Sequence, residues 1–310
     1  MTPMARTDEA KPADRRKSGR KVAAGAFLAA AMLAGGAPAL SPADAASPKT
    51  ALKNGIAAPR SGSVSATYTM GLNGITIGRF KLDATVDQPN YAITIKGTTS
   101  GISRLVSDGT GLLKSSGRLS GGAILPASYY LDTTENGATS SIVDMRMRQG
   151  TIVSATALPP LPIKADRVPL LPQHKHQIVD PLSAMIAPLY PANMARACNR
   201  TIPVFDGWQR FDIRLTYKST AEVKGENGSY SGTVYVCSAR YVPVAGHRPS
   251  REAVKFMERN TNLEVWLAPA VEVGVMLPYR MQIGTEAGVL TIHASRFAAN
   301  DRDERRAASN

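Results

Sequence analysis

The fold class of this 310-residue chain is decided by the stretch Tyr68-Thr69-Met70-Gly71-Leu72-Asn73-Gly74-Ile75-Thr76-Ile77-Gly78-Arg79-Phe80-Lys81-Leu82. Over most of its length, apolar and polar residues alternate, which is the pattern of a β-strand with one buried face. Asn73-Gly74 interrupts the alternation, and this dipeptide favours the two-residue hairpin turn whose central positions both need positive φ. The stretch therefore predicts two antiparallel strands joined by a tight turn.

The same alternation recurs along most of the chain, with Gly, Asn or Ser between the runs. Further strands are predicted at about 91–95, 109–117, 123–133, 139–148, 151–156, 211–217, 230–241, 263–267, 271–283 and 287–297. In the cleanest run, we expect Phe211, Ile213, Leu215 and Tyr217 to face the interior and Arg210, Asp212 and Arg214 to face water. We predict an all-β fold of ten to thirteen strands, in one curved, incompletely closed antiparallel barrel with one or two short helices.

Residues 157–178 break the alternation. Proline lacks the donor that a central strand needs, so this proline-rich segment is predicted to cross the fold as an extended loop. A short helix over 181–187 should follow, with Asp180 as its N-cap and Pro181 in the first helical position. Ser250 is predicted to cap a second short helix, and residues 226–228 (Glu-Asn-Gly) to form a turn.

The beginning of the chain has the three parts of a secretory signal peptide. A basic cluster at 15–21 precedes an uncharged run at 22–40, and Ala43-Asp44-Ala45 provides a small-residue cleavage site. The uncharged run is rich in Ala and Gly, so we expect cleavage rather than anchoring, with no transmembrane segment left afterwards. The predicted division is signal peptide 1–46, flexible segment 47–62, β domain 63–298 and disordered charged tail 299–310. The predicted location is the periplasm.

The two cysteines, Cys198 and Cys237, are predicted to form a disulfide bond, since an oxidising compartment favours pairing. They lie too far apart in sequence for a redox-active motif. The formal net charge of the chain is +13, and removal of residues 1–46 lowers it to +10. This charge suits an anionic partner such as lipid, lipopolysaccharide or a cell-wall component, or it only keeps the protein soluble. Export argues against nucleic acid.

Residues with catalytic or metal-binding chemistry are sparse. His174 and His176 follow a proline in a polar loop without an evident third ligand, so no metal site is predicted. Ser183 lacks the sequence signatures of a nucleophilic serine and is expected to help satisfy helix amides. We therefore expect neither an enzyme nor a cofactor.

Four residues are candidates for ligand binding: Asp206, Trp208, Arg248 and Trp266. Asp206 and Trp208 are either a polar anchor and an aromatic platform, or parts of a corner in which Asp206 caps a turn while Phe205 packs inward; the corner is favoured. Arg248 either meets an anionic ligand or is solvated in its loop. Trp266 is out of phase with its apolar neighbours, which fits either packing or a ligand groove.

The order of these elements resembles a family of proteobacterial periplasmic proteins known as domain of unknown function 3108. The resemblance spans about residues 64–297 and rests on segments 71–72, 77–78, 180–184, 204–207, 241–246 and 265–269 together with Cys198 and Cys237. It implies a curved, incompletely closed antiparallel sheet, similar to periplasmic lipoprotein-carrier folds, and no assigned activity.

Three functions follow in order of preference. The first is non-enzymatic binding of a lipid-like or envelope-polymer ligand in an apolar concavity of several hundred Å³. The second is a structural or interaction role in envelope integrity without a small ligand, which predicts a filled core. A hydrolase is third.

The export hypothesis is tested by N-terminal sequencing of protein taken from the periplasm. The first residue should be Ala46 or Ser47, because the small-residue site directs cleavage there. An intact Met1 in a cytoplasmic fraction would contradict it.

Overall fold

The computed structural model describes residues 60–99, 108–225 and 229–301, and within them nearly every element is a β-strand. Fourteen strands form one antiparallel sheet that does not close on itself, so the predicted fold class is confirmed. Thirteen strands follow one another in the order β7-β6-β5-β4-β3-β2-β1-β14-β13-β12-β11-β10-β9, and short β8 pairs with β13.

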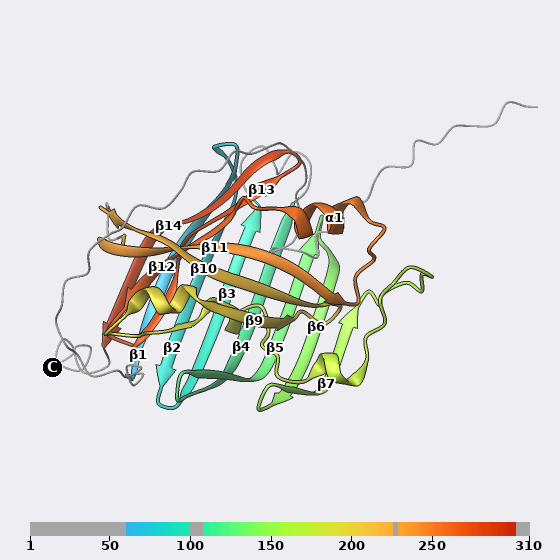
Figure 1. The fold of residues 1–310 in the computed structure, drawn as a ribbon, viewed down its shortest axis with the longest axis horizontal. Helices are drawn as coiled ribbons and strands as arrows, with labels where there is room; N and C mark the ends of the chain where they lie inside the picture. Colours follow the sequence, from blue (N-terminus) through green and yellow to red (C-terminus); the bar gives the residue numbers. More distant parts are fainter. Residues whose placement is uncertain (1–59, 100–107, 226–228, 302–310) are drawn as a thin grey trace, which may run out of the picture.

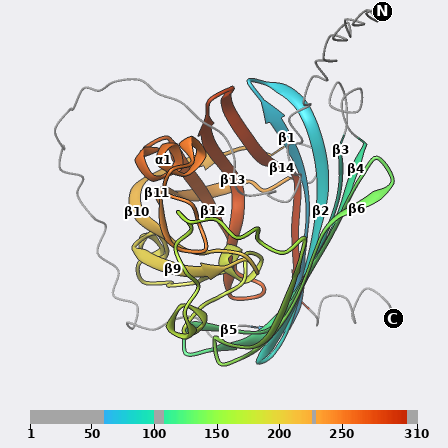
Figure 2. The same cartoon turned by 90° about the vertical axis from the view of Figure 1, so that its right-hand side faces the viewer.

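The sheet consists of two meanders. The first contains β1 (Gly62–Leu72), β2 (Ile75–Asp87), β3 (Asn90–Thr99), β4 (Gly109–Ser120), β5 (Ala123–Glu135), β6 (Ala138–Arg148) and β7 (Thr151–Leu158). The second contains β9 (Arg200–Phe205), β10 (Arg210–Val223), β11 (Gly232–Ala245), β12 (Leu263–Ala270), β13 (Val275–Thr285) and β14 (Gly288–Asp301), with β8 (Ala187–Pro188) on β13. Pairing of β1 with β14 joins them, so β7 and β9 are the two free edges. In Figure 2 the first meander forms one wall, and β9–β12 lie opposite its concave side.

The hairpin that predicts the fold forms at the join between the meanders. Asn73 and Gly74 have φ of 49° and 83°, as the predicted turn requires. The Asn73 side chain also accepts a hydrogen bond from the Val289 backbone and donates one to the Ala287 carbonyl, which ties this turn to the β13–β14 turn. On the inner face, Tyr68 is fully buried and stacks on Phe80 with a centroid distance of 4.8 Å.

The predicted crossing loop, from β7 to β9, bridges the two free edges. Its Ile178 N–H donates to the carbonyl of Gly150 (2.9 Å), in the turn that leads into edge strand β7. One residue later, Val179 exchanges two backbone hydrogen bonds with β9, from its N–H to Pro203 O (2.8 Å) and from Phe205 N–H to its carbonyl (3.0 Å). The edge strands β7 and β9 therefore do not pair with each other, and the strand-like segment around Ile178 and Val179 spans the gap between them. This segment is drawn in yellow-green in Figure 1.

Several predicted elements differ from the structure. The helix predicted over 181–187 is only a turn of 3-10 helix at Ser183–Met185, because the chain becomes extended at Ile186 to place β8 on β13. The strand predicted at 271–283 begins only at Val275, because residues 271–274 form the turn between β12 and β13. Strand β9 was not predicted because it contains Pro203, which an edge strand tolerates. The second helix, α1 (Glu252–Arg259), forms, but Ser250 donates its hydroxyl to Asp166 rather than capping it.

The predicted orientation of β10 is correct in its middle and wrong at its ends. Leu215 is buried, and Arg214 is exposed. Tyr217 is 38% exposed, since β10 has run past its pairing with β9 and a bulge follows. Arg210 and Asp212 are not solvated as predicted; they pair with each other at 2.7 Å and their side chains are 13% and 18% exposed.

The predicted disulfide is present, and the Cα atoms of Cys198 and Cys237 lie 5.1 Å apart. It connects the 3-10 helix Met194–Cys198, which leads into edge strand β9, with β11 on the far side of β10. In the sheet, β9 has a hydrogen-bonded strand neighbour, β10, on one side only. The disulfide is therefore a second attachment that holds this edge strand to the sheet.

Some predictions concern residues outside the described ones: the signal peptide at 1–46, the turn at 226–228 and most of the charged tail. Strand β14 runs to Asp301, so Ala299 and Asn300 belong to the sheet although the predicted domain boundary is 298. No helix among the described residues has the length and apolar character needed to cross a membrane.

Substitution of Leu215 by Asp should abolish folding or soluble accumulation, since a buried unpaired charge costs several kcal/mol. The matched substitution Arg214→Asp, one residue away on the exposed face, should change the free energy of unfolding by less than about 0.5 kcal/mol. Urea unfolding of both variants measures this, and equal effects would contradict the assigned orientation.

Candidate functional site

A cavity of about 200 Å³ lies between the two walls of the open barrel. One side is the inner face of the first meander, with Leu113, Tyr129 and Leu131, and the other is the inner face of β9–β13. Apolar side chains dominate the lining: Ile202, Val204, Phe211, Ile213, Leu215, Tyr241, Met257, Leu263, Val265, Leu267, Met281 and Ile283 are among them. Pro181, Ala184 and Met185 of the crossing segment also belong to the lining.

Asp206 and Trp208 line this cavity, at the corner between β9 and β10. Asp206 Oδ1 accepts the backbone N–H groups of Trp208 (2.8 Å) and Gln209 (2.6 Å), and Phe205 is buried. This is the corner interpretation of the sequence. Burial raises the pKa of Asp206 to about 6, although the two N–H donors act in the opposite direction. A carboxylate therefore borders the cavity at neutral pH.

Two glycines allow the close contacts that this corner makes with its neighbours. Gly207 has φ of 101°, and a Cβ there would meet Val143 of β6 at 2.7 Å, so the corner rests directly on the opposite wall. Gly246 has φ of 82°, and a Cβ there would clash with the Trp208 carbonyl oxygen. The Trp208 indole N–H donates to the Pro159 carbonyl (2.9 Å), which fixes the ring beside the crossing loop.

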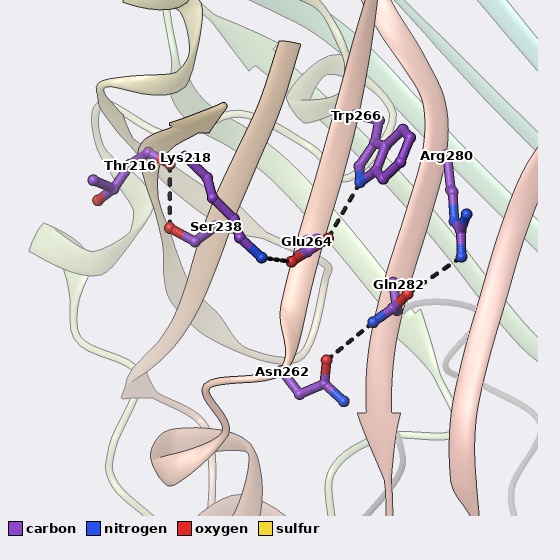
Figure 3. Close-up of polar contacts among 8 residues, drawn as sticks. All are labelled: Thr216, Lys218, Ser238, Asn262, Glu264, Trp266, Arg280 and Gln282. Atoms are coloured by element: carbon purple, nitrogen blue, oxygen red, sulfur yellow. Dashed lines mark hydrogen bonds and ion pairs between the residues drawn. The ribbon is translucent and has the colours of Figure 1, made fainter. Parts of the chain in front are cut away.

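Arg248 and Trp266 lie outside the cavity lining. Arg248 pairs with Asp166 of the crossing loop at 2.7 Å, and hydrogen bonds from Ser250 and Arg248 lower the pKa of Asp166 to about 2. Figure 3 shows Trp266 beside Arg280, whose guanidinium lies 5.1 Å from the ring centroid. The indole N–H donates to Glu264 (3.2 Å), which also pairs with Lys218. The structure thus brings two of the four candidates together.

Sequence reasoning missed Arg200, the first residue of β9. Arg200 pairs in register with Leu215, and both line the cavity. Its Nη2 donates to the Ile186 carbonyl (3.0 Å), while its buried Nε has no hydrogen-bond partner among the described residues. Burial lowers the pKa of Arg200 to about 10, so the guanidinium is charged at neutral pH. The arginine lies outside any alternating run, so no sequence pattern points to it.

Next to the cavity lies a buried polar cluster around Asp180, which is fully buried. Asp180 Oδ1 accepts the N–H groups of Leu182 and Ser183, each at 3.0 Å, as the capping prediction required. Oδ2 accepts the hydroxyls of Ser115 (3.0 Å) and Ser183. Tyr91 OH lies 2.6 Å from the Ser183 hydroxyl. The hydroxyl of Ser183 thus contacts Asp180, Ser115 and Tyr91, none of which is a histidine.

Other features of the described residues are weaker candidates for a binding or metal site. A shallow hollow of about 530 Å³ lies on the outer face of β1–β5, lined by Arg79, Lys81 and Lys96 among others. These three side chains are exposed, so the hollow excludes little water. No group of three or more His, Cys, Asp or Glu side chains in the described part could hold a metal. His174 and His176 make separate contacts, with Leu171 N–H and Thr151 respectively.

The fold and the cavity define the chain as an open antiparallel β-barrel protein with an apolar interior. The family described as "Protein of unknown function (DUF3108)" matches residues 67–295, and the chain belongs to this family. A solved structure described as a β-barrel-like protein of domain of unknown function DUF1849 from Brucella abortus aligns with a TM-score of 0.47 and 10% identity, covering 78% of this chain and 99% of that one. No curated protein matches the sequence.

Asp206 should make stability depend on pH in a defined direction. Its folded-state pKa of about 6 exceeds the ordinary value of 3.8, so the folded state takes up the proton first as the pH falls. Asp206→Asn keeps the Oδ1 acceptor without the charge and should raise the free energy of unfolding at pH 7.5 by about 1–3 kcal/mol. This gain should shrink as the pH falls from 6 towards 4.

Urea unfolding of wild type and Asp206→Asn at pH 7.5, 6, 5 and 4 measures the effect. Asp108→Asn removes the same charge from an exposed position and serves as the control. A gain that is constant or grows towards pH 4 would show that the Asp206 carboxylate is not destabilised by burial.

Proposed function

We propose that this chain is a non-enzymatic protein of the cell envelope that holds a lipid-like ligand in the apolar cavity between its two walls. The observation that carries the proposal is the cavity itself: about 200 Å³ of space surrounded mainly by apolar side chains of both meanders. Core packing normally leaves few voids larger than a water molecule. An engineered apolar cavity of about 150 Å³ stays dry and binds benzene, so a cavity of this size can hold an apolar group.

The cavity is smaller than the several hundred Å³ that the sequence argument required of a lipid carrier. A ligand of this size is a short apolar chain or the end of a longer one. The envelope location rests on the predicted signal peptide, and the basic charge of the chain agrees with anionic surroundings.

Mass spectrometry of lipids that co-purify with periplasm-extracted protein tests the proposal. Wild type should carry bound lipid. Ala239→Phe, which places a ring into the cavity lining, should carry much less, because the bound group loses its space. Ala92→Phe adds the same ring on the exposed face of β3 and should keep the wild-type load.

If Ala239→Phe retains the lipid, the ligand binds at a surface other than the cavity. Absence of lipid from wild type, with no binding of added amphiphiles, would favour a structural role in the envelope without a small ligand.

A further inference from the structure

Among the described residues, Arg200 is the one Lys or Arg in the lining of the apolar cavity, and no carboxylate pairs with it. None of the ion pairs found within the described ranges includes Arg200. The side-chain hydrogen bond that it makes within the described part goes to a neutral carbonyl, that of Ile186. Buried or half-buried charges in proteins are normally paired, because a charge that leaves water loses its hydration. An anion would supply the counter-charge that the described residues do not offer Arg200.

The backbone holds Arg200 firmly in this place. Cys198, two residues earlier, is bonded to Cys237, and the Asn199 side chain accepts the Tyr217 N–H at 3.0 Å. In an antiparallel pair, directly opposite residues share a face. Arg200 is opposite Leu215, a buried lining residue, so register directs its side chain to the cavity.

The two ends of the cavity along β9 carry opposite charges. Asp206 follows the other end of the strand, six residues from Arg200, which corresponds to roughly 20 Å at about 3.3 Å per residue. Ile202 and Val204 lie between them in the lining. An anion at the Asp206 end would meet a carboxylate, whereas at the Arg200 end it meets an uncompensated guanidinium with a free buried Nε.

We propose that Arg200 binds the anionic head group, a carboxylate or a phosphate, of an amphiphile whose apolar part occupies the cavity. This inference rests on the proposed function and names the chemical class of its ligand. A planar guanidinium can offer two parallel N–H donors to either head group, and such charge-assisted pairs are stronger than neutral hydrogen bonds.

Four probes separate the contributions of chain and head group: octanoate, octyl phosphate, octanol and inorganic phosphate. Their affinities for the mature wild-type protein are measured by calorimetry at pH 7.5, below micelle-forming concentrations. We expect octanoate or octyl phosphate to bind about tenfold or more tightly than octanol, as a charge-assisted hydrogen bond would give. Inorganic phosphate should bind much more weakly than octyl phosphate, because it lacks the apolar part.

Arg200→Met keeps an apolar side chain of similar length and should abolish the preference for the charged probes while octanol still binds. Arg214→Met removes an exposed arginine of β10 and should leave all affinities unchanged. Arg200→Lys should restore part of the preference, since it returns the charge without the paired donors.

Equal affinity of wild type for octanol and octanoate would overturn the role of Arg200 and leave the proposed cavity function intact. The same conclusion follows if Arg200→Met keeps the preference. No binding of any probe by wild type would contradict the proposed function as well, and equal binding of inorganic and octyl phosphate would show that the site takes a free anion. If Arg200→Met fails to fold, the octanol-to-octanoate ratio of wild type decides.

Discussion

The open barrel depends on one buried carboxylate. Asp180 is removed from water, and such a group persists only when hydrogen bonds replace its hydration. Two of its donors are amides of its own turn, and Ser115 comes from β4 of the first wall. Burial raises the pKa of this carboxyl above its ordinary value while these donors oppose the rise. Asp180 thereby fixes the crossing segment to the first wall just where Val179 pairs with the edge strand of the second.

This anchoring explains how a sheet with two free edges stays folded around an interior. Strand edges expose unpaired backbone groups, and a fully closed barrel is the usual way to remove them. Here the edges do not pair; instead the crossing segment donates a hydrogen bond to Gly150, in the turn before β7, and both donates to and accepts from β9. The β9–β10 corner adds a second contact through Gly207 against Val143. Because two local contacts replace a continuous ladder, the walls stand apart between them, and the space left is the cavity.

The sequence predicts those parts of this structure that depend on neighbours in the chain. Alternation and the Asn73-Gly74 turn suffice for the hairpins, since each meander pairs consecutive strands. The Asp206 corner and the Asp180 cap are also local, because their partners lie two or three residues away. Pairing of β1 with β14 joins residues more than 200 positions apart, and no periodicity encodes it. The cavity also depends on such distant pairing, so its lining could not be read from local patterns: the sequence left open whether Trp266 and Arg248 face a ligand, and it drew no attention to Arg200.

The charges around the cavity show that its two ends are chemically different. Arg248 and Lys218 each have a carboxylate partner, as surface cations that serve structure usually do. Asp206 has its own partners in the backbone amides of its turn. Arg200 is the one Lys or Arg of the described residues in the cavity lining, and its side chain donates only to a carbonyl oxygen. The disulfide next to it keeps the start of β9 in place, so Arg200 cannot relieve its burial by moving the strand into solvent. A fold that fixes a cation beside apolar surface without a counter-charge bears the desolvation cost of that cation, and an anion is the partner that would offset it.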